Sequence, residues 1–221
     1  MKGLRITLAA GVAAALACTS LSARADEERG LSAGVRVGYA IPVGDAYTNR
    51  SLGDFAGGAN PWWFDLGYRF NPHLYVGAFY QFAMTYPPNH TCGRTPGGVA
   101  QSCDGNYQKF GVDAAFHILP THLLDPWVGV GIGYEISRTN FFANPGNETN
   151  YVARGWQYFD IQLGADFLFS RRIPFGPFLD LSFSQYSYAS NGDQNGKSAD
   201  AYIASTLHEW LTLGIRGQFN F

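Results

Sequence analysis

The chain has 221 residues, of which 46% are hydrophobic, 16% aromatic and only 14% charged, and its formal net charge is −2. So many apolar residues exclude a disordered chain, and the lack of a basic excess argues against a nucleic-acid partner. After residue 25 no apolar run approaches the roughly 20 residues of a membrane-spanning helix, which excludes a polytopic helical membrane protein, yet the 27 glycines and 30 tyrosines and phenylalanines (13 and 17) still need an explanation.

Residues 1–25 have the pattern of a secretory signal peptide. A short basic start, with Lys2 and Arg5, precedes an apolar core that ends at Cys18, and Ala23 and Ala25 form a small-x-small cleavage site. We therefore expect residues 1–25 to be removed and residues 26–221 to form one exported domain. The residues before Cys18 faintly resemble a lipoprotein box, so lipidation at Cys18 is the open alternative.

Two cysteines, Cys92 and Cys103, remain after such cleavage, and both lie in the polar, Pro- and Gly-rich segment 85–106. Two cysteines in an exported chain indicate one disulfide between them. The alternative is a free thiol or a metal ligand, but two sulfurs with the nearby His90 make a poor metal set. We expect no metal site and no cofactor.

Eight stretches alternate between apolar residues and polar or small ones, which is the period of a β-strand with two different faces. They span residues 31–41, 62–70, 74–84, 107–118, 127–136, 156–169, 175–186 and 207–221. Their connections are alternately long and short, and this rhythm predicts a meander with tight turns at one end. The short connections carry turn dipeptides at Asn71-Pro72, Leu119-Pro120, Asp125-Pro126 and Ile173-Pro174.

The composition of the two strand faces indicates which of them points inward. The apolar face is large and aromatic toward both strand ends, as are the girdles at the two interfaces of a membrane. The other face is small, with glycines at positions 34, 38, 67, 77, 111, 129, 131, 133, 164 and 214. Glycine weakens a strand, whereas the inside of a narrow barrel needs small residues. The sequence therefore predicts an all-β, eight-stranded, antiparallel, up-and-down transmembrane β-barrel rather than a soluble barrel or sandwich.

The signal peptide, the eight amphipathic stretches and a last stretch in which Leu213, Ile215, Phe219 and Phe221 alternate resemble the small outer-membrane β-barrels of Gram-negative bacteria. The pattern is similar to the OmpA transmembrane domain and to OmpX- and OmpW-like proteins, and it covers residues 26–221 with motifs generic to such barrels. The resemblance implies a location in the bacterial outer membrane, reached through the periplasm. The tight turns and both termini would lie on the periplasmic side, and loops 42–61, 85–106, 137–155 and 187–206 outside.

The resemblance also implies partners. Phe219 and Phe221 occupy the positions of the C-terminal insertion signal that the barrel-assembly machinery reads, and periplasmic chaperones would accompany the chain before insertion. In the membrane we expect a monomer surrounded by outer-membrane lipid and lipopolysaccharide.

Charged side chains gather on the small, inward face. They are the cations Arg36, Arg69, Lys109 and Arg216, the carboxylates Asp65, Asp113, Glu135, Asp160, Asp166 and Asp180, and the histidines His117 and His208. Charges in a narrow lumen must pair or stay hydrated to offset their desolvation, so we expect a salt-bridge network that fills the barrel. The alternative is a narrow channel or a conduit for small or hydrophobic solutes, with water-filled pockets beside the glycines.

These features predict a structural or surface-exposed role without catalysis. The remaining alternative is a lipid-modifying hydrolase, and its only local candidates are His208, Ser205 three residues earlier and Glu209 beside it. Neighbouring residues of a strand point to opposite faces, so His208 and Glu209 do not form a base with its orienting group. No catalytic residue is therefore predicted.

Overall fold

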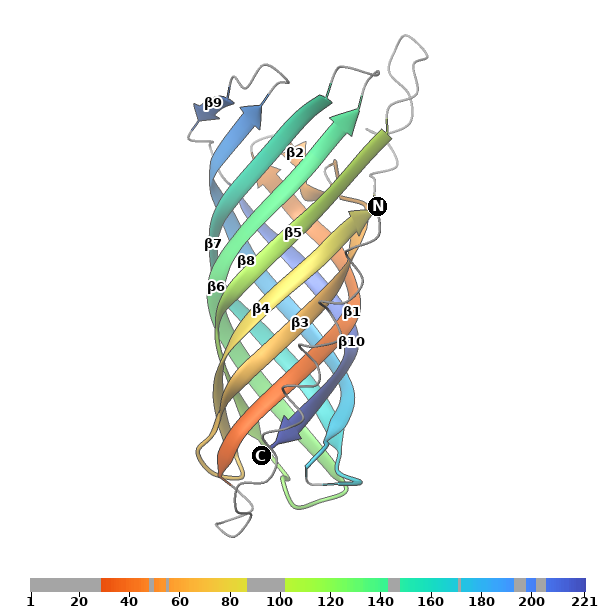
Figure 1. Ribbon diagram of the computed structural model, residues 1–221, viewed down its shortest axis with the longest axis vertical. Coiled ribbons are helices and arrows are strands. Elements are labelled where there is room, and N and C mark those ends of the chain that lie inside the picture. The colour runs from red at the N-terminus through yellow and green to blue at the C-terminus, as the bar shows by residue number, and fades with distance from the viewer. Residues whose placement is uncertain are drawn as a thin grey trace, which may run out of the picture.

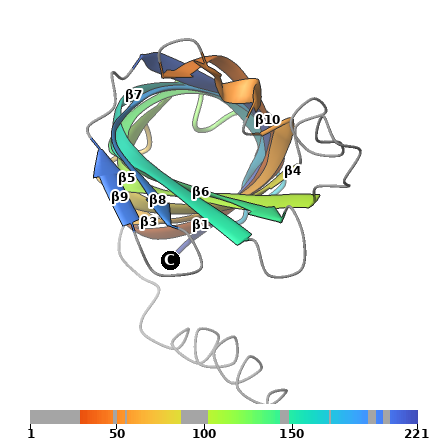
Figure 2. The same ribbon diagram turned by 90° about the horizontal axis from the view of Figure 1, so that it is seen from above.

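The computed structural model describes residues 29–47, 50–54, 56–86, 102–142, 148–170, 172–192, 198–201 and 206–221. Eight long antiparallel strands form one sheet that closes into a barrel, seen from the side in Figure 1 and along its length in Figure 2. They are β1 (Gly30–Tyr47), β3 (Gly58–Arg69), β4 (Leu74–Tyr86), β5 (Ser102–His117), β6 (Leu124–Phe142), β7 (Glu148–Phe167), β8 (Phe175–Gly192) and β10 (Leu207–Asn220). Within the described residues, no helix is long and apolar enough to cross a membrane.

The two ends of the barrel differ. At the turn end, where β1 begins and β10 ends, the connections 70–73, 118–123 and 168–174 are short. The opposite end, uppermost in Figure 1, is the loop end, and it carries the short strands β2 (Arg50–Ser51) and β9 (Ser198–Ala201) and the 3-10 turn η1 (Leu52–Asp54). This arrangement confirms the predicted meander with tight turns at one end.

Pairing of the first and last long strands closes the sheet. β1 and β10 lie antiparallel from Ser32 opposite Asn220 to Gly44 opposite His208. Each of the other long strands pairs with its neighbours in chain order. Closure gives the backbone N–H and C=O groups partners all around the ring, which a sheet in hydrocarbon requires because lipid offers none.

Side-chain exposure follows the predicted alternation. On β3, Trp62, Phe64 and Leu66 are 48–63% exposed, whereas the intervening Trp63 and Asp65 are 4–5% exposed. The same outward apolar face continues around the barrel, and a belt of this size would be untenable in water. The assignment of the apolar face to lipid and of the polar face to the lumen is confirmed.

Turn-end connections are closed by side chains that cap the backbone. The Asn71 side-chain oxygen accepts hydrogen bonds from the backbone N–H groups of His73 at 2.8 Å and Leu74 at 2.9 Å. Asn favours such turns because its short side chain reaches the backbone two or three residues on. In the next turn the Asp125 carboxylate accepts the N–H of Leu119 at 3.1 Å.

The expected loop boundaries are wrong, because the strands run well beyond the alternating stretches. β1 continues to Tyr47 through the expected loop 42–61. β6 and β7 stay paired as far as Phe142 opposite Glu148, across most of the expected loop 137–155. An antiparallel ladder needs only backbone hydrogen bonds. Beyond the hydrocarbon layer of the membrane neither face has to be apolar, so these extensions show no alternation in the sequence.

The inner face is also less small than predicted. Its buried aromatic side chains are Trp63, Tyr75, Phe79, Tyr107, Trp127, Phe178, Tyr186 and Trp210. Glycines make room for these rings. A Cβ atom on Gly67 or Gly77 would collide with the Tyr75 side chain, and one on Gly214 would collide with Phe178. The water-filled pockets considered beside the glycines are therefore wrong at these positions, where rings occupy the space.

Gly164 provides a test of this packing. It lies opposite Trp127 across β6 and β7, and a Cβ atom there would strike the indole ring. We expect Gly164→Ala to lower the free energy of unfolding by about 1–3 kcal/mol, the usual effect of overpacking. Gly217→Ala is the matched control, since no atom lies within 4 Å of its added Cβ, and we expect a change within about 0.5 kcal/mol.

Denaturant unfolding of both variants, refolded in detergent micelles, measures the difference. Equal unfolding midpoints for the two alanine variants would refute the interlocking of Gly164 with Trp127.

Candidate functional site in the barrel lumen

The structure places all twelve predicted charged and histidine residues on the inner face. Eleven of them are 5% exposed or less, and Arg69 at the turn end is partly buried. Their side chains form three levels along the barrel, described here from the turn end to the loop end. Each level joins strands that are not neighbours in the sheet.

At the turn end, Arg216 on β10 makes a two-point ion pair with Asp166 on β7. Its Nε and terminal nitrogen donate to the two carboxylate oxygens at 2.9 and 2.5 Å. The guanidinium also lies over the Trp127 ring, 3.5 Å from the centroid, and the indole Nε1 donates to Asp166 at 3.3 Å. Two-point Arg–carboxylate pairs have the strongest geometry available to an ion pair, and here both partners are almost fully buried.

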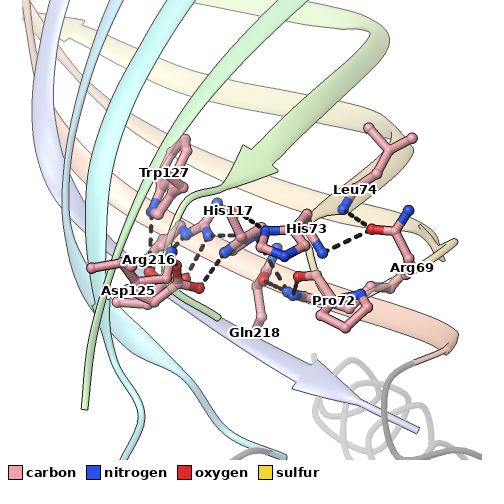
Figure 3. Close-up of polar contacts among 12 residues, drawn as sticks. Arg69, Pro72, His73, Leu74, His117, Asp125, Trp127, Arg216 and Gln218 are labelled. Atoms are coloured by element: carbon pink, nitrogen blue, oxygen red, sulfur yellow. Dashed lines mark hydrogen bonds and ion pairs between the residues drawn. The ribbon is translucent and has the colours of Figure 1, made fainter. Parts of the chain in front are cut away.

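His117 continues this level (Figure 3). Its Nδ1 lies 2.6 Å from the Asp125 carboxylate, and its Nε2 lies 3.3 and 3.5 Å from the terminal nitrogens of Arg69 and Arg216. Guanidinium nitrogens only donate hydrogen bonds, so Nε2 accepts and Nδ1 donates to Asp125. Both ring nitrogens are thereby occupied. The backbone carbonyl of His117 accepts a hydrogen bond from His73 Nδ1 at 2.7 Å.

In the middle level, a single guanidinium connects four strands. Arg36 on β1 donates to Asp65 on β3 at 2.8 and 2.7 Å, to Asp113 on β5 at 2.5 Å and to Gln162 on β7 at 2.6 Å. Gln162 in turn donates to Asp160 at 2.7 Å. Two carboxylates on one cation offset the burial of all three groups, because desolvated charges are stable only when they are paired and hydrogen-bonded.

The level nearest the loop end is built on Glu135 of β6. Its Oε1 accepts hydrogen bonds from the Tyr186 hydroxyl at 2.6 Å and from Trp210 Nε1 at 3.2 Å, and its Oε2 lies 3.3 Å from Lys109 Nζ. Lys109 also donates to Ser182 on β8 at 2.8 Å. The ring of Tyr107 packs on Trp210 with centroids 4.6 Å apart.

Two predicted residues of the network make fewer contacts. Asp180 is 3% exposed, and no ion pair joins it to another residue in the described ranges. His208 is fully buried, stacks on Tyr186 with centroids 4.2 Å apart and has Nε2 3.6 Å from Glu135. The adjacent Glu209 points to the opposite face of β10 and is half-buried, so the two do not act as a pair.

Other expected sites lie partly outside the described residues. Ala23, Ala25, Cys92 and Ser205 are not among those residues, and Cys103 is described only as part of the backbone of β5. The signal peptide, its cleavage and the disulfide stay predictions. Phe219 and Phe221 are described: both are exposed, and their rings meet edge to face at 4.8 Å. Their role as an insertion signal is also still a prediction.

Sequence reasoning missed Asp125 and the neutral partners Gln162, Ser182 and Gln157, the last of which donates a hydrogen bond to Asp160 at 2.5 Å. Asp125 stands in an Asp-Pro dipeptide, which was interpreted only as turn chemistry. Yet it is 1% exposed and is the carboxylate partner of His117. The sequence does contain a sign of this inward position, because Asp125 is two residues before the inward-facing Trp127 and therefore lies on the same face of β6.

The two mouths of the lumen differ in polarity. A cavity of about 60 Å³ at the turn end is lined by Arg69, His117, Asp125 and Asp166 among others. At the loop end, Leu52 of η1 is 2% exposed and belongs to an apolar cluster with alanines and the rings of Tyr107, Tyr186 and Trp210. The cavity is thus lined by residues of the turn-end level, the apolar cluster includes rings of the loop-end level, and the Arg36 level lies between them.

The buried Arg216–Asp166 pair yields a stability prediction. We expect Asp166→Leu or Arg216→Met alone to destabilise the barrel by about 3–5 kcal/mol, because each leaves an uncompensated buried charge. The double variant should lose much less than the sum of the two, since no charge is then left unpaired. Denaturant unfolding of the four proteins measures the coupling, and additive losses would contradict the pairing.

Comparisons with known proteins agree with this architecture. The family description "outer membrane protein beta-barrel domain" matches residues 10–208. No curated protein sequence matches the chain. Among solved structures, Neisserial surface protein A is 14% identical, with 90% of this chain and 100% of that one covered and a TM-score of 0.46.

Two further structures extend the comparison. A major outer membrane protein from Thermus thermophilus is 11% identical, covers 85% of this chain and 99% of its own length, and has a TM-score of 0.50. OprG from Pseudomonas aeruginosa is 12% identical, with 88% and 98% covered and a TM-score of 0.44. At such identities a likeness to a structure concerns the fold alone. By the family match, which spans most of its length, the chain belongs to the outer membrane β-barrel domain family and is located in the bacterial outer membrane.

Proposed function

We propose that this protein is a non-conducting, non-catalytic outer-membrane barrel with a structural or surface-exposed role. The observation that carries the proposal is the contact between Tyr107 and Trp210. Their strands, β5 and β10, lie on opposite sides of the eight-strand ring, and yet the two rings are 4.6 Å apart. Side chains therefore meet across the full width of the lumen.

The other two levels support the same conclusion. Arg36 reaches from β1 to Gln162 on β7 at 2.6 Å and to Asp113 on β5. At the turn end, His117 on β5 lies 3.5 Å from Arg216 on β10. A solute that crossed the barrel would have to break buried ion pairs at successive levels and leave charges unpaired, and each such break is strongly unfavourable. The interior of an eight-stranded barrel is just wide enough for side chains to fill or for one small ligand, and here the side chains of three levels occupy it.

The narrow channel or solute conduit is the alternative. The turn-end cavity and the apolar Leu52 cluster at the loop end are its two candidate entrances. The Arg36 level lies between them, and the Glu135 level adjoins the Leu52 cluster; both favour the closed barrel.

Hydrolytic activity finds little support in the lumen. His117 has the Asp partner of a general base, but its second nitrogen accepts hydrogen bonds from Arg69 and Arg216 and is not free to take a proton from a nucleophile. If the protein modified lipid, lipid A profiles of cells with and without it would differ. We expect identical profiles.

Reconstitution into planar bilayers tests the closed barrel. We expect the folded protein to insert without unit conductance steps above the empty bilayer, because the three levels block the lumen. Heat-dependent migration on SDS gels confirms that the inserted protein is folded. Reproducible steps of one size would defeat the closed barrel and establish the narrow channel.

A further inference from the structure

The outward face of β6, β7 and β8 carries a band of aromatic rings toward the loop end. Trp156 and Tyr158 on β7 are 57% and 49% exposed, and Trp156 meets Tyr134 on β6 edge to face at 5.4 Å. Trp and Tyr rings prefer the boundary between hydrocarbon and headgroups. The band therefore marks the loop-end interface of the membrane on this side of the barrel.

Two exposed arginines lie just beyond this band on the same outward face. Arg154 precedes Trp156 by two positions on β7, toward the loop end, and lies opposite Ile136, while Arg138 on β6 lies opposite Val152. The two arginines are thus diagonal neighbours on one face, close enough for long side chains to reach one ligand. Figure 1 shows β6 and β7 side by side up to the loop end.

Both guanidinium groups are available to a ligand. Arg154 lies over the Tyr188 ring, with its Cζ 4.2 Å from the ring centroid, and a guanidinium stacked on an aromatic ring can still donate hydrogen bonds from its N–H edge. Within the described ranges, no ion pair or hydrogen bond joins Arg138 or Arg154 to a protein group. The nearest outward carboxylate in register, Asp104, accepts a hydrogen bond from Asn140 at 2.8 Å. In the lumen, by contrast, Arg36 and Arg216 are both paired with carboxylates.

The outward-facing charges at the loop end also differ in sign between strands of the ring. Asp45 is exposed at the loop end of β1, the strand across the ring from β6, and Glu209 is half-buried at the loop end of the adjacent strand β10. An anion at the loop-end interface is therefore attracted to β6 and β7 and repelled from β1 and β10.

The depth of the two arginines in the membrane indicates which anion they bind. Two strand residues advance about 6.6 Å along the strand, which is about 5 Å in depth at a barrel tilt of about 40°, so Arg154 lies on the headgroup side of the Trp156 ring. Phosphate groups of lipids occupy the headgroup layer, and the planar guanidinium fork matches phosphate oxygens with paired hydrogen bonds. We propose that Arg138 and Arg154 together bind the phosphate of a phosphorylated lipid headgroup at the loop-end interface, with Tyr188 orienting Arg154. This site goes beyond the proposed function and does not depend on a closed lumen.

The test compares two double variants in detergent micelles. R138Q/R154Q removes both charges of the site, and R29Q/R172Q removes two exposed arginines at the turn end. Native mass spectrometry with diphosphorylated lipid A at increasing concentration gives the binding constant of each protein. At about 1 kcal/mol for each basic residue near a lipid headgroup, we expect R138Q/R154Q to bind about thirtyfold more weakly. R29Q/R172Q should bind like the unaltered protein.

Two further arms identify the ligand. Dephosphorylated lipid A should bind all proteins equally weakly, and inorganic phosphate in large excess should not displace the diphosphorylated lipid. Unchanged binding by R138Q/R154Q, or equal weakening by R29Q/R172Q, would overturn the site, and displacement by inorganic phosphate would overturn its assignment to lipid. Heat-dependent migration on SDS gels verifies folding. If the double variant does not fold, the single variants R138Q and R154Q replace it, and each is expected to weaken binding about fivefold.

Discussion

The hydrogen-bonded seam between β1 and β10 is the contact on which the rest of the structure depends. Lipid supplies no hydrogen-bond partners, so a sheet in hydrocarbon must close on itself. The seam runs from Ser32 to Gly44 on β1 and so covers most of that strand's length. Once the ring is closed, successive residues of every strand face lipid and lumen in turn, and the low charge and high aromatic content of the chain follow from that division.

Closure with only eight long strands also determines what the lumen contains. The interior is narrow, so large side chains fit only where the facing strands carry none. Trp127 fits because Gly164 lies opposite it, and its ring then supports the Arg216 guanidinium that binds Asp166. Glycine, ring and ion pair thus form one packing unit. The many glycines and the buried charges, which look unrelated in the sequence, have a common cause in the diameter of the ring.

The sequence was informative wherever the signal was local. Alternation identified the eight strands, the outward face and the inward charged residues, because a strand's two faces are set by neighbouring positions alone. It could not show that Arg36 reaches Gln162, or that Tyr107 meets Trp210, because such contacts depend on strand tilt and on stagger around the ring. The strand extensions beyond the hydrocarbon layer were not predicted for a different reason. Alternation arises because one face of each strand meets hydrocarbon, and it ends where the hydrocarbon ends.

A lumen occupied by cross-strand pairs limits where the protein can interact with anything else. The pairs that stabilise the ring also occupy the functional groups of the interior. Both ring nitrogens of His117, for example, are hydrogen-bonded, one to Asp125 and the other to Arg69 and Arg216. Groups without protein partners therefore have to be sought on the outward face. Arg138 and Arg154 lie there beyond the aromatic band and make no ion pair with the residues that the structure describes, whereas Arg36 and Arg216 in the lumen are paired with carboxylates. The lumen therefore stabilises the fold, and recognition falls to the outer surface. A filled barrel leaves only its rim and its boundary with lipid as surfaces that can bind a partner.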